Sequence, residues 1–334
     1  MLQELTKRIM AGENLPQDQA DRALELILCE ETPEVAIASF LSALAIKGET
    51  ADEVAGFARA MRRHVVPLRN KHSITVDTAG TGGGLDTFNI STTAAFVIAG
   101  AGLPVAKHGN RAITSRCGSA DVLAALGVNV NAPASVAESC LNEFGLAFMF
   151  APLFHPSMKR VAVIRRQLGH RTIFNLLGPL TNPAGAPYQI IGVYSPSLTE
   201  KLAQALSHLE CRRAWVVHSH DGLDEMSTSA PTRVSEVGPD GVKTFDFNAQ
   251  EFGVKVADLS SLRGALPEQN AAITRGILEG EIRGAARDIV VLNTAAAVHL
   301  ACQESFESAL NRAEQSLDSG AALGKLEKLI EACR

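Results

Sequence analysis

The sequence predicts an α/β fold joined to an additional all-helical domain, and three observations lead to this class. Helix signals fill residues 1–68, apolar strand patterns begin at Ile74, and a glycine-rich turn links the first strand to an apolar helix. A chain of 334 residues is long enough for two domains, each with its own core. We therefore expect a discontinuous helical domain, residues 1–68 plus about 133–177, packed on an α/β domain of residues 70–132 plus 178–334.

The N-terminal helices are predicted from the residues at their ends. Thr32 and Pro33 form a cap followed by a favourable first helical residue, and Gly48 stops the same helix. Residues 50–53 read TADE, a capping box that opens the next helix, which Pro67 ends. A further helical stretch, roughly residues 135–169, interrupts the α/β pattern.

A glycine-rich loop follows the first predicted strand, residues 74–76. The segment 77–92 reads DTAGTGGGLDTFNIST, and a helix is predicted for residues 93–101. Four glycines among residues 80–84 cost backbone entropy that a simple connection does not need. A strand, a glycine loop and a helix together aim backbone N–H groups at an anion, which predicts a phosphate or pyrophosphate site.

The spacing of this loop excludes two familiar phosphate-binding motifs. Leu85 stands where the third glycine of a dinucleotide fingerprint belongs. A Walker loop ends in Gly-Lys-Ser/Thr, and no lysine occurs between Gly80 and Lys107. The loop is therefore a phosphate site of another class, or a flexible turn.

Two more predicted strands end in polar clusters. Residues 104–106 precede KHGNR, in which Lys107 offers a point charge and Arg111 a planar fork for phosphate. Residues 214–218 precede DGLDE, whose adjacent carboxylates suit Mg²⁺ shared with a phosphate. Because ligands bind outside the carboxyl ends of parallel strands, the three loops together predict a Mg²⁺–polyphosphate site.

Composition favours a cytoplasmic enzyme. A net charge of −5 argues against non-specific nucleic-acid binding, which depends on clustered basic residues. No apolar run approaches the roughly 18 residues of a membrane helix, so no membrane association is expected. The six cysteines are scattered without metal-binding spacing, which indicates reduced thiols.

These motifs, taken in order, resemble those of the anthranilate phosphoribosyltransferase family. The matching segments are GTGG (80–83), TFNIST (87–92), KHGNR (107–111), GSADVLAALG (118–127), HPSMK (155–159), RRQLGHRTIFNLLGPLTNP (165–183) and DGLDEMS (221–227). The family's glycine loop usually reads GTGGD and is one residue longer. Here Gly84 stands in the acidic position, with Asp86 as the candidate substitute, and Ser219 replaces a common glycine.

The resemblance implies a nucleoside phosphorylase/phosphoribosyltransferase-like two-domain fold, that of the class III phosphoribosyltransferases. It implies transfer of the phosphoribosyl group of 5-phosphoribosyl 1-pyrophosphate (PRPP) to the amine of anthranilate, in tryptophan biosynthesis. Mg²⁺ is the implied cofactor. The helical domain would form a homodimer interface, and the site would lie in the cleft between the domains.

The same resemblance assigns the site residues. Anthranilate would contact Gly80, Asn110 and Arg165, with Arg165 facing its carboxylate, and Mg²⁺ would bind Ser91, Asp224 and Glu225. PRPP would contact Gly80, Gly83, Gly84, Thr87, Asn89, Ile90, Ser91, Thr92, Lys107, His108, Gly109, Asn110, Arg111, Ala112, Ile113, Thr114, Ser115 and Ser119.

No side chain is assigned as a nucleophile or as a general acid or base. The aromatic amine is already neutral at pH 7, so catalysis falls to Mg²⁺ and cations that neutralise the departing pyrophosphate. His108 is a candidate substrate contact or a structural histidine, and His155 is assigned no proton transfer.

Two other functions remain open from the sequence. A pyrimidine nucleoside phosphorylase shares the fold and the glycine loop, but the segments RTIFNLLGPLTNP and DGLDE favour the transferase. A relative that lost synthesis and binds nucleic acid should carry a basic groove and a damaged acceptor site. The acidic chain, with Asn110 and Arg165 in place, disfavours that function.

Overall fold

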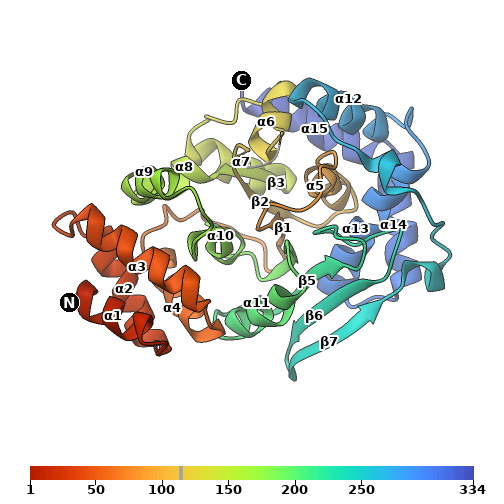
Figure 1. Cartoon of the computed structure of the whole chain (residues 1–334). Helices are drawn as coiled ribbons and strands as arrows, with labels where there is room; N and C mark the ends of the chain where they lie inside the picture. The colour runs from red at the N-terminus through yellow and green to blue at the C-terminus, as the bar shows by residue number, and fades with distance from the viewer. Residues whose placement is uncertain (113–115) are drawn as a thin grey trace.

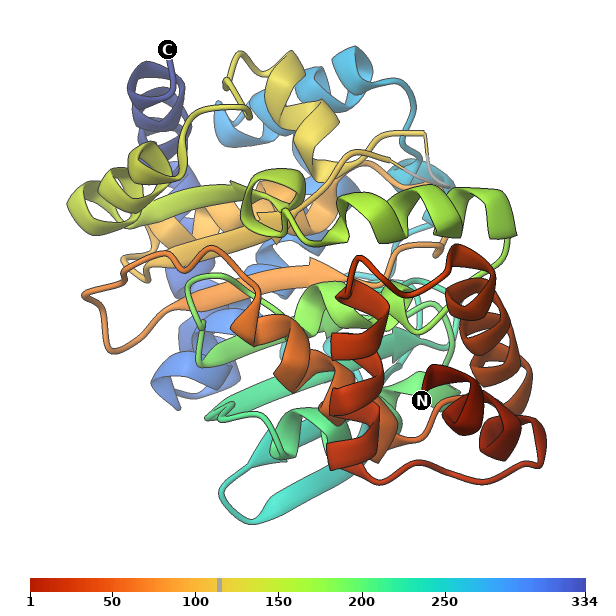
Figure 2. The ribbon, with the colours of Figure 1, turned by 90° about the vertical axis from the view of Figure 1, so that its left-hand side faces the viewer.

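The chain folds into a bundle of N-terminal helices packed beside a seven-stranded sheet that is covered by helices (Figure 1). The computed structural model describes residues 1–112 and 116–334. The N-terminal bundle contains α1 (Leu2–Met10), α2 (Gln17–Leu28), α3 (Glu34–Lys47) and α4 (Ala51–Arg63). The view of Figure 2 places these helices beside α9 (Met158–Leu168), and Val161 and Ile164 of α9 belong to the same apolar core as the bundle.

The sheet has the strand order β3-β2-β1-β4-β5-β6-β7. The first five strands in this order run parallel, and the last two are antiparallel. The strands are β1 (Val76–Gly80), β2 (Val105–Gly109), β3 (Leu146–Phe150), β4 (Tyr188–Gly192), β5 (Arg213–Ser219), β6 (Thr232–Gly238) and β7 (Gly241–Phe247).

The centre of the sheet contains a topological switch point. From β1 the chain continues to β2 on one side, and it later returns to add β4 on the other side. Ligands of open α/β sheets bind in the crevice that such a reversal leaves outside the carboxyl ends of the strands. Here two glycines, Gly80 and Gly192, lie side by side at these ends in the β1–β4 register. The fold therefore places a crevice at the glycine loop.

Apolar cores cover both faces of the sheet. Trp215 and Val217 of β5 pack into one core, whereas Ala214 and Val216 pack into the other, as the alternation of a strand requires. Helix α5 (Ile90–Gly100) and helices from the C-terminal half cover the first face, and the N-terminal bundle with α11 (Ser197–Ser207) covers the second. The remaining helices are α5 (Ile90–Gly100), α6 (Ser119–Ala125), α7 (Ala134–Phe144), α8 (Ala151–Phe154), α10 (Phe174–Leu177), α11 (Ser197–Ser207), α12 (Pro267–Leu278), α13 (Ala285–Cys302), α14 (Phe306–Asp318) and α15 (Ala321–Ala332), with short 3₁₀ turns at Gly178–Leu180, Ala249–Phe252 and Leu259–Leu262.

Helix α13 corrects one sequence expectation. It is long and apolar enough to cross a membrane by length and composition, with a mean hydropathy of 1.3 over its 18 residues. However, 72% of this window is buried inside the protein, where α13 packs against α5 and α14. Its apolar character is that of a core helix.

Local predictions differ from the structure at several boundaries. The stretch predicted to be helical, residues 135–169, contains the strand β3, which pairs with β2 at the sheet edge. Strand β2 runs on through Lys107 and His108, which the sequence placed in a loop. The Thr32 hydroxyl donates to the Leu26 carbonyl rather than capping α3, which begins after Pro33. By contrast, the capping box at Thr50 and the positive φ of Gly48 at the end of α3 are confirmed.

Candidate active site

The glycine loop is held at the end of β1 by the end of β4. The Thr81 N–H donates to the Gly192 carbonyl at 2.9 Å, and the Tyr194 N–H donates to the Thr81 hydroxyl at 3.3 Å. Gly82 and Gly83 have φ angles of +68° and +86°, a region in which L side chains are strained. The loop conformation therefore requires glycine for its backbone, as the sequence predicted.

Asp224 lies directly beneath this loop. A Cβ on Gly84 would overlap the Asp224 carboxylate, and a Cβ on Gly192 would overlap its backbone carbonyl. At Gly80 a Cβ would still lie 3.5 Å from the Asp224 carboxylate. The absent side chains at Gly84 and Gly192 thus leave room for an acidic residue at the switch point, whereas a Cβ on Gly80 would be in ordinary contact with it.

Glu225 lies half-buried beside Asp224, with Ser91 as a hydrogen-bond partner. Burial and the neighbouring Asp224 raise the pKa of Glu225 to about 8, although Lys107 and Ser91 act in the opposite direction. Burial also raises the pKa of Asp224. Two adjacent carboxylates with raised pKa values favour a cation between them, so this pair and the Ser91 hydroxyl form an oxygen set of the kind that Mg²⁺ binds. In the described part of the chain, no cluster of three or more His, Cys, Asp or Glu side chains provides a site for another metal.

Lys107 connects the carboxylates to the core of the sheet. Its ammonium donates to the Thr78 carbonyl and lies 3.4 Å from the Ser91 hydroxyl, while the residue is only 4% exposed. Burial lowers the pKa of Lys107, and the charges of Asp77 and Glu225 partly restore it. Lys107 is thus a buried cation between two acidic groups, pointing to the carboxyl end of β1.

Asp77 is a buried carboxylate that interacts with the charge of Lys107, and no role was predicted for it from the sequence. Its carboxylate accepts hydrogen bonds from the His108 N–H at 3.2 Å and from the Asn182 amide at 2.7 Å. Burial raises its pKa to about 6, with Lys107 and these hydrogen bonds lowering it in part. Its position just before the glycine loop could have indicated a role for Asp77. Its partner Asn182, however, is 105 residues away in the sequence, so the contact could not be predicted.

His108 forms a neutral pair with His155. Their Nε2 atoms are 3.2 Å apart, and His108 Nδ1 lies 3.1 Å from the Gly178 carbonyl. Since a carbonyl only accepts, His108 carries its proton on Nδ1, and His155 must donate from Nε2. Burial lowers the pKa of His108 to about 3 and that of His155 to about 4, so neither ring is charged at neutral pH. The buried Nδ1 of His155 has no hydrogen-bond partner among the described residues.

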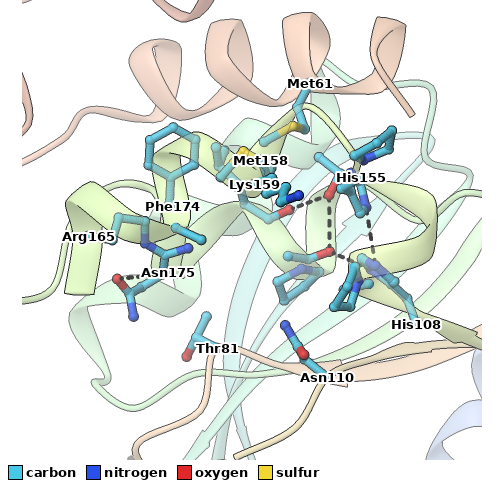
Figure 3. A pocket seen from close by; sticks show the side chains of 18 of the residues that line it. Met61, Thr81, His108, Asn110, His155, Met158, Lys159, Arg165, Phe174 and Asn175 are labelled. Atoms are coloured by element: carbon cyan, nitrogen blue, oxygen red, sulfur yellow. Dashed lines mark hydrogen bonds between the residues drawn. The ribbon is translucent and has the colours of Figure 1, made fainter. Parts of the chain in front are cut away.

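The predicted acceptor residues line one cavity. Gly80, Asn110 and Arg165 all contribute to a cavity of about 750 Å³ between α9, α10 and the ends of β1 and β2 (Figure 3). Apolar side chains complete its wall, including Met61 of the N-terminal bundle and Phe174 of α10. The cavity therefore opens where the helical bundle meets the sheet.

Arg165 is the central cation of this cavity. Its guanidinium donates to the Asn175 amide oxygen at 3.4 Å and lies 5.6 Å from the centre of the Phe174 ring. Burial lowers its pKa, and no carboxylate within the described ranges offsets this effect. A partly buried arginine without a counter-ion is suited to binding an anionic ligand. Asn175, which also accepts from the Thr172 N–H at 3.0 Å, was missed by the sequence analysis because it bears no charge.

The remaining residues predicted to contact PRPP are held in place by contacts within the protein. The Asn89 amide bonds the Cys117 carbonyl and Asn270, and Ile90 and Thr92 are buried in α5. Asp121 binds the Arg111 guanidinium and the Ala112 N–H, and Ser119 donates to the Asn110 carbonyl. Gly109 ends β2 and Thr87 bridges to Arg263, while Ile113, Thr114 and Ser115 lie outside the described residues.

Comparisons with known proteins identify the family of this chain. The helical bundle domain of a glycosyl transferase family matches residues 3–65, and the a/b domain of that family matches residues 72–323. The anthranilate phosphoribosyltransferase of Moorella thermoacetica is 50% identical over 332 residues, which are 99% of this chain and 98% of that protein. The chain belongs to the anthranilate phosphoribosyltransferase family.

Solved structures of this family have the same fold. The enzyme from Thermus thermophilus gives a TM-score of 0.91 at 41% identity, covering 98% of this chain and 99% of that one. The Saccharomyces cerevisiae enzyme in complex with PRPP and Mg gives 0.90 at 31% identity, with 99% and 97% covered. The same enzyme with 4-fluoroanthranilate gives 0.89 at 30% identity, again with 99% and 97% covered. The predicted nucleoside phosphorylase/phosphoribosyltransferase-like fold is confirmed.

Proposed function

We propose that this protein transfers the phosphoribosyl group of PRPP to the amine of anthranilate, giving N-(5-phosphoribosyl)anthranilate and pyrophosphate in tryptophan biosynthesis. The observation that carries the proposal is the position of Gly80. This residue lines the cavity that contains Arg165, and it also lies against the carboxylate of Asp224. An anion-binding loop and an acceptor cavity therefore meet at one residue, as a transfer between two bound substrates requires.

The donor end would bind PRPP over the glycine loop. Backbone N–H groups of the glycine loop would face the pyrophosphate, except that of Thr81, which donates to the Gly192 carbonyl, and Lys107 would approach from β2. Ser91, Asp224 and Glu225 would hold Mg²⁺, whose charge neutralises the pyrophosphate as it leaves. Asn89, Ser119 and the segment from Lys107 to Ser115 would contact the phosphoribosyl part.

The acceptor end would orient anthranilate in the cavity. Arg165 would bind its carboxylate, Asn110 and Gly80 would contact the ring and amine, and the apolar wall would exclude water. The His108–His155 pair is neutral and internally bonded, so it supports a shaping role and no proton transfer. With the amine neutral at pH 7, orientation and neutralisation of the leaving group are the chemistry left to these residues.

We further propose a helical domain that forms a homodimer in the cytoplasm. Of the residues expected for it, 1–68 plus about 133–177, we assign to it residues 1–68 with α9 and α10, because β3 joins the sheet and α7 packs against β3. Three large apolar side chains of α1 and α3 support the interface, since Met10, Val35 and Ile46 are 73%, 77% and 88% exposed. These side chains lie on two helices that pack against each other, and a contiguous exposed apolar patch marks an interaction site. Val35→Glu with Ile46→Glu should convert a dimer to a monomer in sedimentation experiments. A wild-type chain that sediments as a monomer would contradict the dimer.

Pyrophosphate release distinguishes this function from nucleoside phosphorolysis. The purified protein is incubated with PRPP and Mg²⁺, with and without anthranilate, and pyrophosphate is measured enzymatically. We expect release that depends on anthranilate. In a parallel reaction, uridine or thymidine with inorganic phosphate should give no free base. Release of base without anthranilate-dependent pyrophosphate would favour the phosphorylase instead.

A further inference from the structure

A second arginine, Arg171, lies at the glycine loop, against Gly83 and Tyr194. Its guanidinium carbon is 3.6 Å from the centre of the Tyr194 ring, which is a stacked cation–π contact. A Cβ on Gly83 would overlap the same guanidinium. The planar cation is therefore placed directly against the loop backbone, at the position where a side chain is missing.

The position of Arg171 follows from the turns on either side of it. Helix α9 ends at Gly169, which has a φ of +66°, and the Thr172 N–H donates to the Asn175 amide oxygen at 3.0 Å. Tyr194 is itself attached to the loop, because its N–H donates to the Thr81 hydroxyl. Arg171, Tyr194 and the glycine loop thus form one connected unit.

The charge of Arg171 is available to a ligand. Its stacking partner is an aromatic ring rather than a carboxylate, and the side chain is exposed. Lys107, by comparison, is buried and already donates to the Thr78 carbonyl. A planar guanidinium can donate two parallel hydrogen bonds to phosphate oxygens, which an ammonium group cannot.

We propose that Arg171 binds the pyrophosphate of PRPP over Gly83 and neutralises it as it leaves. This inference rests on the proposed function. Stacking on Tyr194 orders the side chain before the substrate arrives, which reduces the entropy lost on binding. Because Arg165 and Asn175 belong to the same segment, the turn that places Arg171 at the donor also forms the acceptor cavity. One segment thereby contacts both substrates.

The test compares Arg171→Gln with Arg283→Gln, a matched loss of one exposed arginine in the turn between α12 and α13. Steady-state kinetics give the KM for each substrate, and calorimetry gives the Kd for magnesium pyrophosphate without turnover. We expect Arg171→Gln to raise both the PRPP KM and the pyrophosphate Kd about tenfold or more, with an unchanged anthranilate KM. For Arg171→Lys, the PRPP KM and the pyrophosphate Kd should lie between those of the wild type and those of Arg171→Gln. Tyr194→Leu should raise the PRPP KM severalfold.

The possible outcomes separate this inference from the function on which it rests. An active wild-type enzyme in which Arg171→Gln matches Arg283→Gln in both measurements would overturn the role of Arg171. An increase confined to the anthranilate KM would also overturn it, because the cation would then serve the acceptor. A folded wild-type protein that consumes no anthranilate would instead contradict the proposed function. Arg171 is exposed, so circular dichroism should confirm that the variants are folded.

Discussion

Replacing Arg165 with Met tests the acceptor site most sharply. Met fills much of the same volume and keeps the contact with Phe174, but it removes the guanidinium from the cavity. Within the described residues, only the 3.4 Å hydrogen bond to Asn175 and the contact with the Phe174 ring compensate the burial of this cation, and no carboxylate does. Its main partner is therefore expected to be the carboxylate of anthranilate.

The magnitude follows from the strength of a charged hydrogen bond. Such a bond contributes roughly 1.5–3 kcal/mol, and about 1.4 kcal/mol corresponds to a factor of ten. The kcat/KM for anthranilate should therefore fall about tenfold to a hundredfold in Arg165→Met, mainly through KM. Because the variant removes a partly buried cation, its urea unfolding midpoint should be at or above that of the wild type.

Aniline provides the matched control, because it keeps the aromatic amine and lacks the carboxylate. Pyrophosphate release is measured for both acceptors with the wild type and with Arg165→Met. The wild type should prefer anthranilate, and the variant should lose most of this preference while its kcat/KM for aniline changes little. A variant that still discriminates between the two acceptors as the wild type does would refute the assignment of Arg165 to the carboxylate.

Three further predictions follow from the donor end and the histidine pair. Asp224→Asn combined with Glu225→Gln should abolish activity and weaken the dependence on Mg²⁺, and an unchanged magnesium titration would remove the metal assignment. Gly84→Ala should raise the PRPP KM with little change in the anthranilate KM, because its Cβ would displace the loop from Asp224; kinetics equal to those of the wild type would contradict this close contact. His108 and His155 have folded-state pKa values of about 3 and about 4, below the usual 6.5, so their contribution to stability is present above pH 6.5 and is lost as the pH falls. The free energy of unfolding, measured in urea between pH 6.5 and 5, should fall by roughly 1.4 kcal/mol per histidine per pH unit from this source, and His155→Gln should show a shallower fall. Equal slopes for the two proteins would mean that His155 is not held neutral.

Features determined by neighbouring residues could be predicted from the sequence. Glycine is needed at Gly82 and Gly83 because of their own backbone angles, so the run is visible without the fold. The capping box between Thr50 and Glu53 spans four residues and is present as predicted. Because ligands bind at the carboxyl ends of parallel strands, the sequence predicted that the glycine loop, Lys107 and the carboxylate pair meet at one edge of the sheet. In the structure these groups do lie together.

Features determined by distant residues could not be predicted in this way. The apolar run of β3, residues 146–150, becomes a strand because β2 offers it an edge, and nothing within the run selects this over a helix. Lys107 and His108 were placed in a loop because buried polar residues are unusual in a strand. Their partners, Asp77 and His155, are distant in the sequence, and only the folded chain brings them into contact.

The fluorescence of anthranilate gives the most direct test of the central claim, since phosphoribosylation of the amine alters the fluorophore. Purified protein is mixed with anthranilate, PRPP and Mg²⁺, with a control in which a chelator removes the metal. We predict a loss of fluorescence at an enzymatic rate that requires both PRPP and Mg²⁺. Unchanged fluorescence with a correctly folded protein would contradict the transfer reaction and would show that the shortened glycine loop serves another acceptor or another chemistry.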